Sequence, residues 1–133
     1  MVRPRVLLAD DHSEFLEAER VLLRPYFDLV GMASDGESLV SEAQRLQPDV
    51  VVADISMPGM SGIEAIRKLA ESGCAAKVVF LTVHTDEEFV KVCMEKGGRG
   101  FVWKTRMKTH LIPAIYAVLE GLPYVSPLTV HDS

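Results

Sequence analysis

The stretch Val50-Val51-Val52-Ala53-Asp54 indicates the fold class of this chain. It is a short, continuous apolar run that ends on a carboxylate, and such runs are typical of strands buried on both faces of a parallel sheet. Three other runs end in the same way: Val6-Leu7-Leu8-Ala9 before Asp10 and Asp11, Val78-Val79-Phe80-Leu81 before Thr82, and Gly100-Phe101-Val102-Trp103 before Lys104. The sequence therefore predicts buried strands whose carboxyl ends carry polar side chains.

Segments with helical spacing separate these strands. Strands are predicted over about 5–9, 27–33, 49–53, 77–82 and 100–103, and each is followed by a helical pattern. This alternation predicts an α/β fold, a single five-stranded parallel sheet with helices on both faces and right-handed crossovers. No low-complexity segment or internal linker interrupts the pattern, so we expect one domain.

The helical patterns also predict which side chains face the core. In the first helix, the expected apolar face is Phe15, Ala18, Val21 and Leu22, while Glu14, Glu17, Glu19 and Arg20 are expected mostly on the other faces. Asp35 or Ser34 is expected to cap the second helix. Pro113 lies inside the fifth helix unless Thr109 caps it, which would place the proline in the first turn.

Composition narrows the class of protein. The 133 residues carry a formal net charge of −5, which argues against direct nucleic-acid binding by this segment, since that usually requires a basic face. No apolar stretch approaches the roughly 20 residues needed to cross a bilayer, so a cytoplasmic location is expected. Cys74 and Cys93 are widely spaced and are expected to be structural thiols.

The polar strand ends predict one site. In an open parallel sheet the chemistry gathers at the carboxyl ends of the strands. If the strand over 5–9 lies beside the strand over 49–53, then Asp10, Asp11 and Asp54 share one cavity, and a hard cation such as Mg²⁺ relieves their repulsion. A carboxylate there can act as a nucleophile and form an aspartyl phosphate, with Lys104 and Thr82 binding phosphoryl oxygens.

These segments resemble the receiver domain of two-component response regulators over about residues 3–127. The matching stretches are Val6–His12, Val51–Gly62, Val79–Thr82 and Gly100–Lys104. Gly121-Leu122-Pro123-Tyr124-Val125-Ser126-Pro127 and the Asp10-Asp11-His12 triplet resemble the NarL/FixJ/LuxR-type subfamily. The resemblance implies a flavodoxin-like (βα)5 fold with strand order 2-1-3-4-5, an order for which a chemotaxis receiver is a known example.

The resemblance also implies a role for each site residue. Asp54 accepts the phosphoryl group from a sensor histidine kinase, and Mg²⁺, for which Mn²⁺ could substitute, is bound by Asp11, Asp54 and the Ser56 backbone carbonyl, with Asp10 acting through water. Lys104 and Thr82 bind the phosphoryl group, and Thr82 and Phe101 form the switch. Phe101 stands where many receivers have Tyr. Ser56 and His84 are candidates for tuning dephosphorylation.

The implied organisation is a receiver over residues 1–127 and a tail or linker start over 128–133. The expected output is a change in the face formed by the fourth helix, fifth strand and fifth helix. That face is expected to control a DNA-binding domain C-terminal to this segment. In the alternative, a stand-alone receiver, it contacts a protein partner. A homodimer is a further option, and no membrane partner is expected.

Two other classes of protein share part of this pattern. A haloacid-dehalogenase-type phosphatase also uses an aspartate nucleophile and Mg²⁺, but it needs a second acid two residues later, where this chain has Ser56. A flavodoxin-like cofactor binder needs a phosphate-cradling loop after the first strand, where Asp10 and Asp11 repel an anion. We therefore expect a phosphoacceptor rather than an enzyme.

Overall fold

The structure is a computed structural model that describes residues 3–83, 91, 95 and 99–125. In this part of the chain a parallel sheet has the strand order β2-β1-β3-β4-β5-β6. The strands are β1 (Arg5–Ala9), β2 (Asp28–Ala33), β3 (Val50–Asp54), β4 (Lys77–Thr82), β5 (Gly100–Trp103) and β6 (Tyr124–Val125). The predicted α/β class and the order of the first five strands are confirmed.

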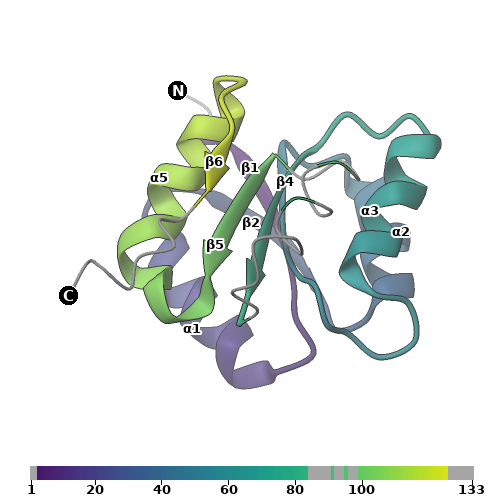
Figure 1. Cartoon of the computed structure of the whole chain (residues 1–133), viewed down its shortest axis with the longest axis horizontal. Coiled ribbons are helices and arrows are strands. Elements are labelled where there is room, and N and C mark those ends of the chain that lie inside the picture. The colour runs from purple at the N-terminus through teal and green to yellow at the C-terminus, as the bar shows by residue number, and fades with distance from the viewer. Residues whose placement is uncertain (1–2, 84–90, 92–94, 96–98, 126–133) are drawn as a thin grey trace.

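Helices cover both faces of the sheet. They are α1 (Ser13–Leu23), α2 (Gly36–Leu46), α3 (Gly62–Glu71) and α5 (Met107–Leu119), which follows the 3₁₀ turn Lys104–Arg106. Figure 1 shows α2 and α3 on one side of the sheet and α1 and α5 on the other. The predicted fourth helix lies mostly outside the described residues. Among the described helices, none has the length and apolar character needed to cross a membrane.

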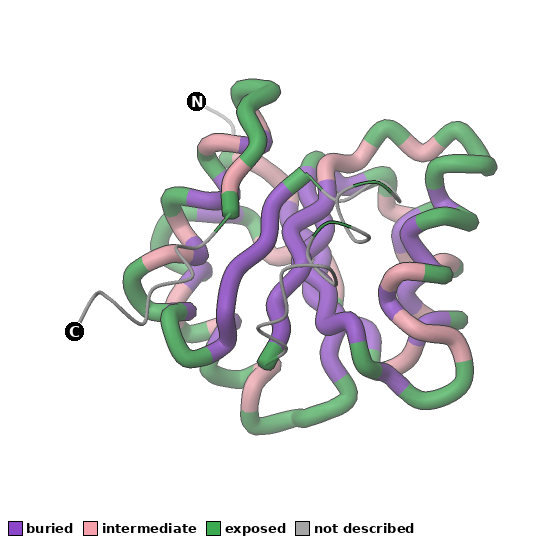
Figure 2. Tube along the Cα trace, viewed as in Figure 1, coloured by how far each residue is buried: buried purple, intermediate pink, exposed green. Residues whose placement is uncertain are grey.

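Strand alternation divides the core into two layers, because successive side chains of a strand point to opposite faces. On β3, Val51 and Ala53 pack with α2 and α3, while Val50 and Val52 pack with α1 and α5. Figure 2 shows the resulting band of buried chain through the centre of the molecule. Burial on both faces explains why these strands are continuous apolar runs.

The sixth strand is an addition to the prediction. Tyr124 and Val125 pair in parallel with Gly100 and Phe101, so the segment after α5 returns to the edge of β5. A backbone hydrogen bond from Tyr124 N to Arg99 O, at 3.1 Å, supports this pairing. The strand has only two residues, too few to produce an alternating pattern in the sequence.

The predicted inward face of the first helix is partly wrong. Val21 is 51% exposed, whereas Glu19 is 1% exposed and lies inside the protein. The buried residues of α1 are Glu19 and Leu23, and Phe15 precedes Glu19 by four positions. Positions four apart share a helix face, so the inward face of α1 follows 15, 19 and 23. The prediction failed because it assigned the acidic residues to solvent by charge alone.

Helix ends follow local chemistry. Asp35 caps α2 as predicted, since its carboxylate accepts a hydrogen bond from Ser38 N at 2.7 Å. Pro113 lies inside α5, six residues after its first residue, so Thr109 is not the cap. The 3₁₀ turn after β5 starts the helix earlier than the sequence suggests. Proline removes one backbone hydrogen bond there.

Candidate functional site

The sheet register brings two aspartates to the same level. Ala9 of β1 pairs with Ala53 of β3, so Asp10, just after β1, and Asp54, the last residue of β3, lie at neighbouring positions on the carboxyl edge. Both are buried, Asp10 at 1% and Asp54 at 5% exposed. Asp10 accepts a hydrogen bond from His12 N at 2.8 Å, and Asp54 accepts one from Ser56 N at 3.3 Å. The two carboxylates are thus held by the loops that follow their own strands.

Lys104 lies between these carboxylates. Its Nζ is 2.8 Å from Asp10 Oδ2 and 3.2 Å from Asp54 Oδ2, and its side chain is 4% exposed. The residue directly follows β5, whose last residue, Trp103, pairs with Thr82 at the end of β4. The predicted convergence of the ends of β1, β3, β4 and β5 is therefore present in the geometry.

Burial and charge act in opposite directions on this cluster. Burial raises the pKa of the Asp54 carboxyl, and the charge of Asp10 raises it further, while Lys104 lowers it. Burial lowers the pKa of the Lys104 ammonium, but its hydrogen bond to Asp10 and the charge of Asp54 outweigh burial and leave that pKa raised. Lys104 therefore stays protonated and compensates the buried carboxylates.

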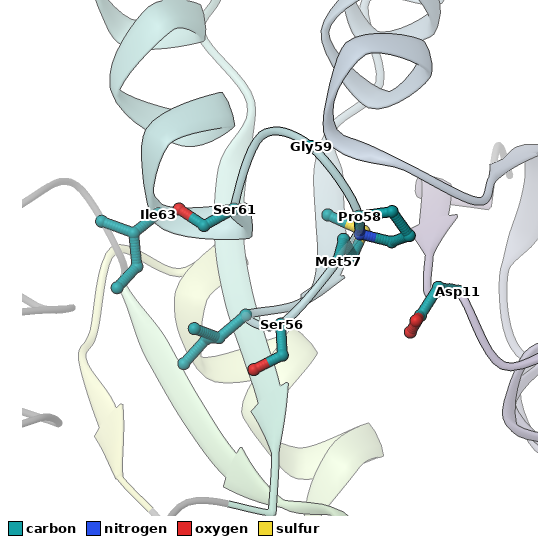
Figure 3. Close-up of a pocket in the computed structure, with 8 residues that line it drawn as sticks. Asp11, Ser56, Met57, Pro58, Gly59, Ser61 and Ile63 are labelled. Atoms are coloured by element: carbon teal, nitrogen blue, oxygen red, sulfur yellow. The ribbon is translucent and has the colours of Figure 1, made fainter.

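Asp11 adds a third carboxylate at the mouth of the site. Ligand atoms of Asp10, Asp11, His12 and Asp54 all lie within 4.8 Å of one another. An open pocket of about 680 Å³ is lined by Asp11 on one side and the loop from Ile55 to Gly59 on the other. In Figure 3 the Asp11 carboxylate lies across the pocket from Ser56. A group of carboxylates with one member, Asp11, on an open pocket suits a hard cation such as Mg²⁺, which keeps several water ligands.

His12 contacts two of these acids. Its Nδ1 lies 3.0 Å from Asp11 Oδ1 and 3.2 Å from Asp10 Oδ1, and the imidazole is 63% exposed. As predicted for a residue at the helix start, it occupies the N-cap position of α1. His84 lies outside the described residues.

The two predicted switch residues lie on the same side of the sheet. Thr82 is 1% exposed, and its place in β4 puts it on the same face as Phe80, which pairs with Phe101. Phe101 is fully buried and its ring packs edge-on against Trp103, with 4.9 Å between ring centroids. The Phe101 ring therefore lies inside the protein in this structure.

The loop after β3 is fixed by a glycine that sequence reasoning did not single out. Gly62 N donates to Ile55 O at 2.8 Å, and Ser61 caps α3 by accepting from Glu64 N at 3.2 Å. A Cβ at Gly62 would overlap the Asp54 carbonyl oxygen. The start of α3 therefore packs directly on the backbone of Asp54, which explains a glycine at the end of the Pro58–Gly62 turn.

Two residues of α1 lie at the site although no sequence motif indicates them as site residues. The Phe15 ring lies against Lys104, with 4.1 Å between Nζ and the ring centroid. One turn later, both carboxyl oxygens of Glu19 are buried without a hydrogen-bond partner within the described chain. The i, i+4, i+8 spacing of Phe15, Glu19 and Leu23 is the signal that indicates their common face.

The family model and the similar known proteins all belong to one family. The family model described as "Response regulator receiver domain" matches residues 6–116. The chain is 34% identical over 130 residues to the transcriptional regulatory protein DegU of Brevibacillus brevis, covering 96% of this chain and 55% of that protein. It is 37% identical over 123 residues to the response regulator UvrY of Escherichia coli K12, covering 91% of this chain and 56% of that protein.

Solved structures agree with the sequence matches. A two-component response regulator of the LuxR family from Aurantimonas sp. SI85-9A1 superposes with a TM-score of 0.89 at 34% identity, covering 94% of this chain and 91% of that one. The signal receiver domain of the putative response regulator NarL from Mycobacterium tuberculosis gives 0.87 at 26% identity, covering 91% and 99%. The chain spans about half the length of the curated relatives it matches.

Proposed function

Because this chain belongs to the response regulator receiver domain family, we propose that it is a phosphorylation switch in which Asp54 accepts a phosphoryl group from a sensor histidine kinase. The observation that carries this proposal is the buried contact of Lys104 with both Asp10 and Asp54. It places a fixed cation beside a buried carboxylate that has a carboxylate oxygen of Asp11 within 4.8 Å.

In the proposed step, an Asp54 carboxylate oxygen attacks the phosphorus of a phosphohistidine. The new O–P bond forms as the P–N bond breaks, and the imidazole leaves with a proton from solvent. Lys104 stays beside the transferred group and stabilises charge on its oxygens. Thr82, buried at the end of β4, donates its hydroxyl to another phosphoryl oxygen.

The donor set fits Mg²⁺, with Mn²⁺ as a substitute. Asp11, Asp54 and the Ser56 carbonyl would hold the ion, and Asp10 would contact it through water. When bound, Mg²⁺ neutralises charge on the phosphoryl oxygens. Asp10 and Asp54 are already paired with Lys104, so the ammonium and the metal share the same carboxylates.

Residues 1–127 form the receiver and 128–133 begin a tail or linker, and the chain works in the cytoplasm. The output is transcription regulation through a DNA-binding domain C-terminal to this segment. The alternative is a receiver that acts by protein–protein contacts. Slow self-dephosphorylation, tuned by Ser56 and His84, returns the switch to its resting state, so the chain is a phosphoacceptor and not an enzyme.

Chelation of divalent metal stops the phosphorylation of this protein. We expect treatment with a small acyl phosphate in Mg²⁺ to add the mass of one phosphate, and excess EDTA to reduce the rate by at least roughly a hundredfold, as for loss of a major charge-stabilising group. Intact-mass spectrometry measures the product, and restoring Mg²⁺ in excess over EDTA is the control. An unchanged rate in excess EDTA contradicts the metal's role.

Replacement of Lys104 by methionine separates metal binding from phosphoryl transfer. Without the ammonium the pocket is more negative by one charge, so we expect Mg²⁺ to bind roughly tenfold more tightly. Transfer slows by roughly a hundredfold because one charge-stabilising donor is lost. Trp103, the single tryptophan of the chain, precedes Lys104 and reports Mg²⁺ titration by its fluorescence. Weaker Mg²⁺ binding together with normal transfer would contradict this assignment. Lys108→Met, on the exposed side of α5, is the matched control.

A further inference from the structure

The Lys104 ammonium has partners from two parts of the fold. Asp10 and Asp54 contact it from the sheet edge, at 2.8 and 3.2 Å. From α1, the Phe15 ring lies 4.1 Å from Nζ, within the distance at which a cation is attracted to an aromatic face. The carboxylates belong to the site already described, whereas the ring comes from a helix to which no role in the site has been given.

The ring matters because the ammonium has little access to water. The Lys104 side chain is 4% exposed, so the hydration that normally stabilises the cation is largely removed. A hydrogen bond to Asp54 and an ion pair with Asp10 replace part of that hydration. The negative face of an aromatic ring is the one class of apolar surface that attracts a cation, and an aliphatic side chain of the same size supplies no such attraction.

The Lys104 ammonium also needs a partner that stays in place when the carboxylates around it are phosphorylated or bind metal. Phosphorylation converts Asp54 into an acyl phosphate. A bound metal ion would also interact with the carboxylates that contact Lys104 in this structure. The Phe15 ring undergoes neither change, since it is held by α1. Its contact with Nζ therefore remains while the other partners of the ammonium are exchanged.

The next inward residue on α1 does not replace the ring. Glu19, four positions on, is 1% exposed and its carboxyl oxygens have no hydrogen-bond partner within the described chain. Burial, with the charge of Asp10 adding to it, raises the pKa of Glu19 well above its ordinary value, although the charge of Lys104 acts in the opposite direction. Of these two α1 residues, the Phe15 ring is the one that lies directly against the ammonium.

We propose that Phe15 is a positioning residue for phosphoryl transfer, because its ring, held by α1, keeps the Lys104 ammonium in place beside Asp10 and Asp54. The inference rests on the proposed function of Asp54 and Lys104 and adds a residue to it. Phe15 does not touch the reacting atoms, and it acts through Lys104 alone.

The test varies the charge distribution of the ring at nearly constant shape. Phe15 is replaced in the whole chain by mono-, di- and trifluorophenylalanine, which weaken the attraction of the ring for a cation in steps. We expect the rate of Asp54 phosphorylation by an acyl phosphate in Mg²⁺ to fall at each step. In Phe15→Leu we expect the same rate to be about two- to thirtyfold lower than in wild type. Phe15→Trp, which keeps an aromatic face, retains more activity than Phe15→Leu.

The controls separate positioning from folding. Trifluorophenylalanine at Phe27, a 2% exposed ring that packs 5.1 Å from Tyr116 and contacts no cation among the described residues, leaves the rate unchanged. Urea midpoints across the fluorinated Phe15 series stay within the scatter of replicate measurements. A rate that does not change across that series, with Phe15→Leu equal to wild type, overturns the inference. Failure of wild-type protein to gain phosphate at Asp54 overturns the proposed function instead.

Discussion

Asp54→Asn abolishes the gain of one phosphate mass on treatment with an acyl phosphate and Mg²⁺. The amide has nearly the shape of the carboxylate but lacks the anionic oxygen that attacks phosphorus, so no O–P bond forms. We expect labelling to fall by more than about a thousandfold, below detection in an intact-mass spectrum, as is usual when a nucleophile is removed. This is the largest effect expected of any single change in the chain.

The variant needs a control for folding and one for specificity. Asp28→Asn, at the exposed start of β2, removes a carboxylate far from the pocket and is expected to label like wild type. Trp103 fluorescence checks that the core beside the pocket is intact in both variants. Full labelling of Asp54→Asn, with the phosphate mapped elsewhere, would falsify the assignment of the nucleophile.

Glu19→Leu stabilises the protein at neutral pH and removes a pH dependence from its unfolding. Wild type buries a carboxyl group with no hydrogen-bond partner in the described chain, and burying such a polar group costs about 1–3 kcal/mol. Leu23, four positions later on the same face of α1, is fully buried in the apolar cluster that joins α1, α5 and the sheet. We expect a gain of about 1–3 kcal/mol in the free energy of unfolding at pH 7.

The sign of the pH effect follows from the direction of the pKa shift. Burial raises the pKa of Glu19 in the folded state, so between the unfolded pKa and the folded pKa the folded protein binds the extra proton. The stability of wild type therefore falls as pH rises through that window, by up to about 1.4 kcal/mol per pH unit from this one group. Ionisation above the folded pKa would add a third charge beside Asp10 and Asp54.

Urea unfolding from pH 5 to pH 8.5 measures this contribution. Glu19→Leu and Glu19→Gln both lack the titrating group, so we expect each to show a shallower decline of the unfolding midpoint with pH than wild type. Glu19→Gln gains less stability, because its amide stays buried without a partner. Glu14→Gln, on the exposed side of α1, is the matched control and keeps the slope of wild type. Identical slopes in wild type and Glu19→Leu contradict the upward shift of the Glu19 pKa in the folded state.

The two α1 residues show where sequence reasoning stops. Asp54, Asp10, Thr82 and Lys104 were identifiable because each follows a continuous apolar run, and all parallel strands direct their carboxyl ends to one edge. Phe15 and Glu19 lie on a helix, where several faces fit an apolar spacing of three and four. Which face turns inward depends on how α1 packs against the sheet and α5, and charge alone assigned Glu19 to solvent.

The sequence by itself determined the class of fold, the strand order through its family resemblance, and the set of polar residues at the strand ends. These follow from local patterns, since burial on both faces produces apolar runs and polar residues end them. Only the tertiary structure decided that Lys104 pairs with two carboxylates, that the Phe15 ring lies against it, that Glu19 is buried, and that Tyr124 and Val125 extend the sheet. Each of these contacts joins segments far apart in the chain or depends on the rotation of a helix about its axis, and neither is encoded in a local pattern of residues.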